Sequence, residues 1–131
     1  MSENKILLRY QKLGKALNAL ERVVDKPVDL ERTYVDSTIQ RFEFTIELFW
    51  KFLKAVLENQ GMDAPFPKIV FQESFRGHFI EDEKIWLQML RDRNNISYTY
   101  EEELADKIYK NINTYVPILK KTYDDLSQKL F

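Results

Sequence analysis

The chain contains no cysteine among its 131 residues, and only one histidine, three glycines and four prolines. Without thiols it can form no disulfide, use no cysteine nucleophile and hold no cysteine-ligated zinc. Phosphate-binding glycine loops and dinucleotide-binding fingerprints need several closely spaced glycines, which this sequence does not have. The single histidine, His78, cannot supply the paired Glu-x-x-His motifs of a two-metal helical bundle. We therefore predict no metal site and interpret His78 as a helix-end or surface residue.

A strong net charge and a long apolar run are also missing. The 20 basic residues are balanced by 21 acidic ones, so the net charge of −1 provides no overall attraction to nucleic acid. The most apolar stretch, residues 46–57, is interrupted by Glu47, Lys51 and Lys54. The first residues show no continuous apolar core of the kind found in signal peptides. We expect a cytoplasmic protein with no membrane-spanning segment.

The residues that are present favour one packed domain over positions 1–131. Apolar residues make up 44% of the chain and aromatic residues 14%, enough for a buried core. From Ile6 to Val24 apolar residues recur three or four apart, which is the spacing of one helix face. A second helix is predicted from about Leu30 to Asn59. Gly61 follows it and suits the left-handed conformation that often ends a helix.

Helical spacing continues through the second half of the chain. A short helix is predicted from Lys68 to about Arg76, and Asp82 can cap the next one. The last helix begins near Glu101, and Pro117 inside it is expected to kink or split it. No run alternates with the period of a β-strand. The predicted fold is an all-α, antiparallel up-and-down four-helix bundle with one short extra helix.

The sequence RDRNNISYTY, residues 91–100, holds an unusual density of donors and aromatic rings. On a continuous helix Arg93, Ser97 and Tyr100 would share one face. A purely structural interpretation is that Arg93 forms an ion pair with Glu43 or Glu47 on a facing helix. The functional alternative is that Arg41, Glu43 and Lys51 line a groove with Arg93, in which the cations bind phosphate. The spacing alone leaves both alternatives open.

Two segments resemble one protein family: IQRFEFTIELFWKFLKAVLENQG (39–61) and WLQMLRDRNNISYTYEEELADKIY (86–109). They are similar to nucleotidyltransferase substrate-binding proteins, small helical bundles related to HEPN domains. The resemblance implies a separate minimal nucleotidyltransferase as partner, which binds ATP or another nucleotide with Mg²⁺, while this chain has no cofactor of its own. The resemblance and the groove alternative together give the candidate nucleotide-binding, substrate-binding or acceptor residues Arg41, Glu43, Lys51, Arg93, Asn94, Ser97 and Tyr100.

The related toxin–antitoxin pairs carry a motif of Arg, four residues, His, one residue and Tyr. Aligned with this chain, the motif gives Arg93, then Tyr98 in place of the histidine, then Tyr100. Histidine exchanges protons near neutral pH, whereas a tyrosine hydroxyl has a reference pKa of about 10 and is a poor base there. The departure argues against RNA cleavage. Tyr100 matches the tyrosine that accepts a nucleotide.

Three hypotheses follow. The leading one is a non-catalytic regulatory partner of the nucleotidyltransferase, homodimeric within a hetero-oligomer, with Tyr100 as candidate nucleotide acceptor. The second is a HEPN-type ribonuclease toxin with a degenerate motif, Arg93 and Tyr98, which acts on RNA. The third is a helical protein-interaction module with no connection to nucleotides.

Overall fold

The computed structural model describes residues 2–27 and 32–131, with side chains from residue 4 onward. These residues form five α-helices and one 3₁₀ turn: α1 (Ser2–Val24), α2 (Thr33–Asn59), α3 (Pro67–Arg76), α4 (Glu83–Asn94), η1 (Ile96–Tyr98) and α5 (Glu102–Leu130). No strand occurs in the described ranges. The predicted all-α bundle is confirmed.

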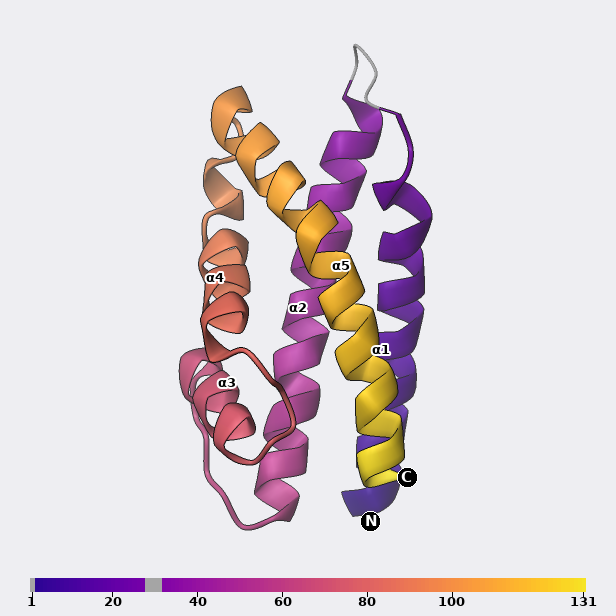
Figure 1. Ribbon diagram of the computed structural model, residues 1–131, viewed down its shortest axis with the longest axis vertical. Helices are drawn as coiled ribbons and strands as arrows, with labels where there is room; N and C mark the ends of the chain where they lie inside the picture. The colour runs from indigo at the N-terminus through magenta and orange to yellow at the C-terminus, as the bar shows by residue number, and fades with distance from the viewer. Residues whose placement is uncertain (1, 28–31) are drawn as a thin grey trace.

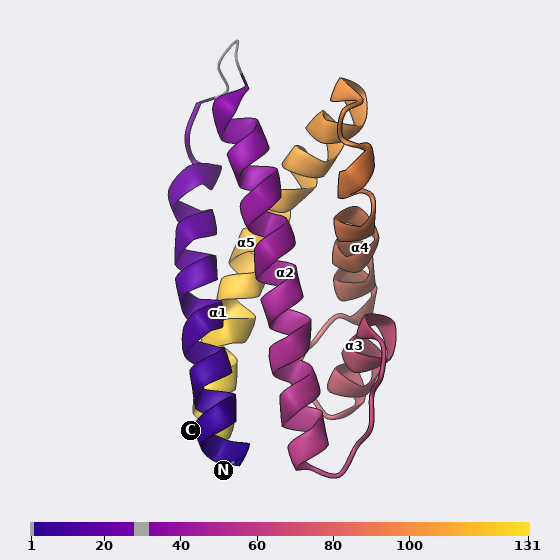
Figure 2. The same cartoon turned by 180° about the vertical axis from the view of Figure 1, so that it is seen from behind.

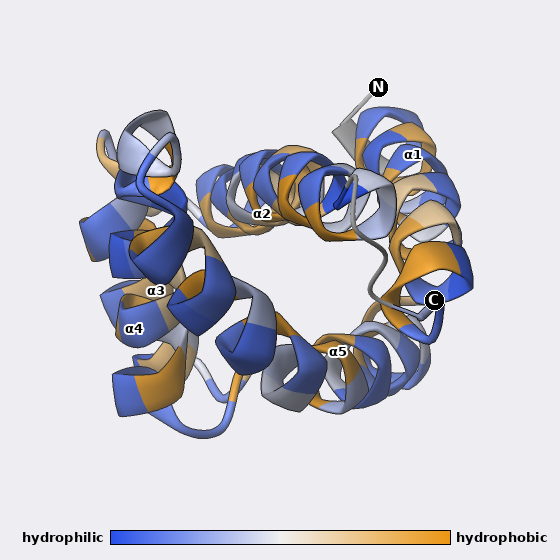
Figure 3. Cartoon of the chain, turned by 90° about the horizontal axis from the view of Figure 1, so that it is seen from above, coloured by the Kyte–Doolittle hydropathy of each residue, from blue (hydrophilic) through white to orange (hydrophobic). Residues whose placement is uncertain are grey.

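The long helices α1, α2 and α5 occupy three corners of the bundle (Figure 1). Helix α1 runs in the opposite direction to α2 and α5, and α3 and α4 return the chain between α2 and α5. The two short helices α3 and α4 fill the fourth corner together (Figures 2 and 3). The predicted short extra helix is α3, with 10 residues, and α4, which has 12, continues the fourth side of the bundle. The break between them includes Gly77 and His78, and His78 adopts a left-handed φ of 62° that a continuous helix cannot contain.

The core lies between the facing sides of the long helices, where apolar residues gather (Figure 3). Helix α2 is its centre, because it packs against α1, α3, α4 and α5. Phe42, Phe49 and Phe52 on α2 are completely buried. The ring of Phe49 meets the edge of Trp86 from α4, with 4.8 Å between the ring centres. Burial of such aromatic side chains supplies much of the free energy that holds helices together.

The ends of the helices follow local rules. Helix α2 ends at Asn59, and Gly61 has a left-handed φ of 83°, as predicted. The predicted beginning of α2 near Leu30 lies outside the described residues, and the helix is observed from Thr33. The Asp82 carboxylate accepts the backbone N–H of Ile85 at 3.4 Å, which confirms it as the cap of α4.

Helix α5 continues through Pro117 as one element, so the predicted split does not occur. A proline removes one helix hydrogen bond, here to the carbonyl of Asn113. Both residues are exposed, so water can bind that carbonyl. Along residues 2–27 and 32–131, none of the helices combines the length and apolarity needed to cross a bilayer.

Two tyrosines join the first helix to the last. The hydroxyl of Tyr10 donates to the carbonyl of Tyr123 at 2.7 Å, and the hydroxyl of Tyr123 donates to the carbonyl of Tyr10 at 3.1 Å. Their rings stack with centres 4.0 Å apart. Gly14 makes this approach possible, because a Cβ there would collide with the Tyr123 hydroxyl.

We predict that Gly14→Ala lowers the free energy of unfolding by about 1–2 kcal/mol, because overpacking outweighs the better helix propensity of alanine. Urea denaturation of the variant measures the change. In a Tyr123→Phe background the colliding hydroxyl is absent, so the loss should be smaller. An equal loss in both backgrounds would contradict the proposed collision.

Candidate functional site

The segment 91–100 is divided between a helix end and a turn. Helix α4 ends at Asn94, and the 3₁₀ turn Ile96–Tyr98 follows. The hydroxyl of Thr99 donates to the carbonyl of Ile96 at 2.6 Å, a local bond that competes with helix continuation. The continuous helix on which Arg93, Ser97 and Tyr100 would share one face therefore does not form.

Arg93 lies in the last turn of α4 and is directed to α2. One guanidinium nitrogen is 2.9 Å from the carboxylate of Glu47, and both side chains are about 30% exposed (32% and 28%). Lys51 approaches the same carboxylate at 3.7 Å, as the i, i+4 spacing predicted. The second terminal nitrogen of Arg93 donates to Asn94 at 3.4 Å. The predicted pairing of Arg93 with a facing glutamate is confirmed for Glu47.

This cluster of two cations and one carboxylate has a formal charge of +1. The Arg93 Nε is buried and has no hydrogen-bond partner among the described residues. A buried donor without a partner is costly. The terminal nitrogen that contacts Asn94 makes only a long bond of 3.4 Å, so it retains hydrogen-bonding capacity for an added anion.

A second network fixes the end of α4 against α5. The Asp92 carboxylate accepts the hydroxyl of Tyr115 at 2.6 Å and the side-chain amide of Asn111 at 3.0 Å. Burial, and then the hydrogen bond to Asp92, raise the pKa of the Tyr115 hydroxyl above its ordinary value. No spacing rule links positions 92 and 115, so the sequence alone does not predict this network.

An ion-pair clamp positions the other end of the turn. Arg32, with a left-handed φ of 59°, precedes α2 and contacts Glu102 at 3.2 Å and Asp106 at 2.6 Å. Both acids lie in the first turns of α5, shortly after Tyr100. The clamp thus holds the start of α5 against the start of α2, and it was also not predicted.

A polar hollow of about 620 Å³ lies between α2 and the turn. Glu43 and Gln40 line it from α2, and Ile96 and Thr99 from the turn. Glu43 therefore lies across this hollow from the segment 91–100. The carboxylate that pairs with Arg93 is that of Glu47 and not that of Glu43. Its polar lining suits hydrogen-bonding groups such as those of a nucleoside.

Arg41 is not brought to Arg93. Its guanidinium donates to the carbonyl of Ala19 on α1 at 2.7 Å. It lines a different groove, between α1 and α2, with Phe44 and Leu48. The expectation of one groove shared by Arg41 and Arg93 is corrected, because residue 41 lies on the side of α2 that faces α1.

The tyrosines of the turn project into solvent. Tyr100 is 80% exposed and Tyr98 is 54% exposed. Ser97, which precedes them in the chain, is also exposed. His78 is exposed, as expected, but it precedes α4, whereas Arg93 lies in the last turn of that helix. The helix therefore separates them by about 15 Å.

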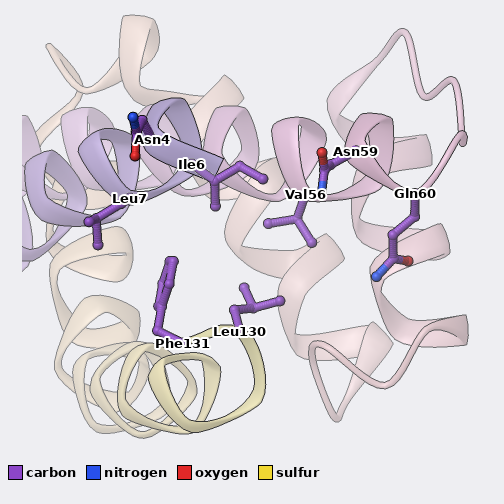
Figure 4. A pocket seen from close by; sticks show the side chains of 8 residues that line it. All are labelled: Asn4, Ile6, Leu7, Val56, Asn59, Gln60, Leu130 and Phe131. Atoms are coloured by element: carbon purple, nitrogen blue, oxygen red, sulfur yellow. The ribbon is translucent and has the colours of Figure 1, made fainter. Parts of the chain in front are cut away.

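A separate hollow of about 390 Å³ lies at the other end of the bundle, where α1 begins and α5 ends (Figure 4). Phe131 projects toward α1, and its ring is 5.2 Å from that of Tyr10. Leu7 and Val56 complete an apolar wall. None of the predicted site residues lines this hollow. In the described part of the chain, no three acidic or histidine side chains converge as a metal site would require.

Residues 8–128 match the protein family described as "Nucleotidyltransferase substrate binding protein like". A relative named "Probable ribonuclease HepT", from Haemophilus influenzae, is 29% identical over 96 residues, which are 70% of this chain and 66% of that protein. The chain thus spans just under two thirds of this curated relative. A protein from Thermus thermophilus with a known crystal structure is 32% identical, with a TM-score of 0.80 over 87% of this chain and 98% of that chain.

The raised pKa of Tyr115 predicts a pH-dependent contribution to stability. The folded protein favours the protonated phenol, so the contribution is complete below about pH 10 and declines as pH rises toward the folded-state pKa. Tyr115→Phe should lower the free energy of unfolding at pH 7 by about 1–2 kcal/mol and flatten its decline above pH 10. Urea denaturation across this range tests both effects.

Tyr109→Phe is the matched control. Tyr109 lies on the same helix, and its hydroxyl has no partner among the residues described. This variant should retain both the stability and the pH profile of the original chain. If Tyr115→Phe and the unsubstituted chain decline with the same slope, the buried hydrogen bond to Asp92 is not the cause.

Proposed function

We propose, since this chain belongs to the nucleotidyltransferase substrate-binding protein-like family, that it is the non-catalytic substrate-binding and regulatory partner of a separate minimal nucleotidyltransferase. In this proposal the partner binds ATP or another nucleotide with Mg²⁺ and performs the transfer. Two copies of this chain pair within the complex. The observation that carries the proposal is the exposure of Tyr100 at the end of a turn anchored on both sides.

Tyr100 is suited to be the acceptor. Its phenol oxygen attacks the α-phosphorus of the nucleoside triphosphate, and a new oxygen–phosphorus bond forms. The bond from that phosphorus to the leaving pyrophosphate breaks, and the hydroxyl proton passes to a base on the transferase. A side chain that is 80% exposed can enter a partner's active site without unfolding its own helix. The turn also brings Thr99 and the polar hollow beside it.

The Arg93 cluster supports this role electrostatically. Arg93 and Lys51 share the single carboxylate of Glu47, so the cluster has an excess of positive charge. A phosphate oxygen can replace Asn94, whose contact with Arg93 is long at 3.4 Å. We propose that Arg93 and Lys51 attract the phosphates of the nucleotide while Glu47 orients the guanidinium.

The name of the Haemophilus influenzae relative favours a second function, cleavage of RNA. Two features of this chain oppose it. Tyr98 stands at the histidine position of the motif, and the only histidine of the chain lies at the opposite end of α4. Charge stabilisation by Arg93 without a proton-transfer group provides only part of a ribonuclease site.

Capture of the tagged protein from its own cells, followed by intact-mass measurement, tests the proposal. We expect a small nucleotidyltransferase in the complex and a nucleotide adduct that Tyr100→Phe abolishes. Tyr98→Phe is the matched control and should retain the adduct, because Tyr98 also projects into solvent from the same turn. An adduct that survives Tyr100→Phe would exclude this residue as acceptor. Absence of a transferase under ATP-containing conditions would favour the generic interaction module.

We predict that the purified protein does not cleave single-stranded RNA, because Tyr98 takes the place of the motif's histidine beside Arg93. Gel analysis of a labelled RNA measures cleavage. Arg91→Ala provides the control for Arg93→Ala, since Arg91 lies in the same helical turn and is exposed. Cleavage that persists in Arg91→Ala and disappears in Arg93→Ala would establish the ribonuclease function instead.

A further inference from the structure

The surface between α1 and α2 carries a groove with an apolar floor. Two hollows, of about 530 and 340 Å³, join there and share Lys12 and Leu48. They extend over residues 5–19 of α1 and 41–51 of α2. We call this surface the basic–apolar groove. Phe44 is 59% exposed and Leu8 is 58% exposed, although large apolar side chains of this size usually pack inside a domain.

Cations border the apolar floor. Lys5, Arg9, Lys12 and Lys15 recur along one side of α1 and are exposed. None of these four forms an ion pair with any residue that the structure describes. The chain as a whole has a net charge of −1, so this row is a local departure from the average. An excess of unpaired positive charge beside exposed apolar side chains is typical of an interaction surface.

The chemistry of the groove selects its occupant. A second copy placed symmetrically on this face would oppose its own row of cations, and like charges at an interface cost free energy. Nucleic acid would place phosphates over the exposed rings and methyl groups of Phe44 and Leu8. An amphipathic helix with carboxylates beside its apolar stripe matches both features. Residues 5–19 rise about 21 Å along α1, the length of a helix of about 14 residues.

We propose that the basic–apolar groove docks an acidic amphipathic helix of a protein partner. Apolar side chains of that helix, spaced three and four apart, contact Phe44 and Leu8. Its carboxylates meet the lysines of α1, whose aliphatic stems extend the apolar floor. The groove shares only Lys51 with the Arg93 cluster and contains neither Tyr98 nor Tyr100. The docking therefore does not depend on nucleotide transfer.

Photo-crosslinking tests the proposal. Phe44→p-benzoylphenylalanine retains an aromatic ring in the groove and forms a covalent bond to its occupant on illumination. The matched control is Phe66→p-benzoylphenylalanine, because Phe66 is an equally exposed aromatic residue (63%) that lies outside the groove. Each full-length protein is produced in its own cells, and the crosslinked peptide is sequenced. We expect the position-44 adduct to contain a protein segment with excess Asp and Glu and with apolar residues at helical spacing.

A charge test accompanies the crosslink. Lys12→Glu combined with Lys15→Glu should reduce the position-44 adduct about tenfold, the combined effect of reversing two exposed ion pairs. Lys68→Glu, an exposed charge reversal on α3, should leave it unchanged. Thermal unfolding of each variant verifies that the fold is retained.

The outcomes are distinct. An adduct with a second copy of this chain, with nucleic acid or with a basic segment would overturn the proposal. So would a yield at position 44 no higher than at position 66, or an adduct indifferent to the Lys12 and Lys15 reversals. An acidic helix from a protein other than a nucleotidyltransferase would also support the docking groove, and the transferase partnership is tested separately by the adduct at Tyr100.

Discussion

The burial of α2 constrains the rest of the molecule. The apolar residues of this helix pack against four other helices, so most of its circumference is buried. The part that stays exposed is a narrow strip that includes Gln40, Phe44 and Lys51. Helix α1 borders the strip on one side, and α3 and α4 border it on the other (Figure 2). A functional surface on this face of the bundle therefore has to combine α2 with α1 or with the α3–α4 side.

The α4 side of the strip depends on where α4 ends. If α4 continued past Asn94, the side chain of Tyr100 would point along the helix face instead of projecting from a turn. Asp92 fixes the last turn of α4 to α5, and Arg32 fixes the start of α5 to the start of α2. The turn between these anchors is short, and its backbone is tethered at both ends. Its two tyrosines are exposed to solvent. Such an arrangement presents a side chain at small entropic cost, because the backbone that carries it is already ordered.

Sequence patterns predicted the features that interactions within a single helix determine, which are helix positions and helix caps. Apolar spacing located α1, α3 and the body of α2, Gly61 marked the C-terminal end of α2, and the Asp82 cap followed from the preference of aspartate for that position. The ion pair of Arg93 with Glu47 was one of two pairings considered, and packing selected it. Patterns failed where two distant elements meet. The direction of Arg41, the Asp92–Tyr115 bond and the Arg32 clamp all depend on tertiary packing, which no spacing within one helix reveals.

The two sides of the α2 strip differ in how completely their charges are compensated. On the α4 side Glu47 is held between Arg93 and Lys51, which offsets part of their charge and orders that cluster before any ligand arrives. On the α1 side the lysines have no carboxylate partner among residues 4–27 and 32–131, so their interaction free energy becomes available when a partner supplies one. The residues that bind a partner can then differ from the residues that react. A partner held through the α1 side need gain nothing from the Tyr100 turn, and that turn can remain accessible to a reactive group. Lys51 lies where the two surfaces meet, so its charge acts on both.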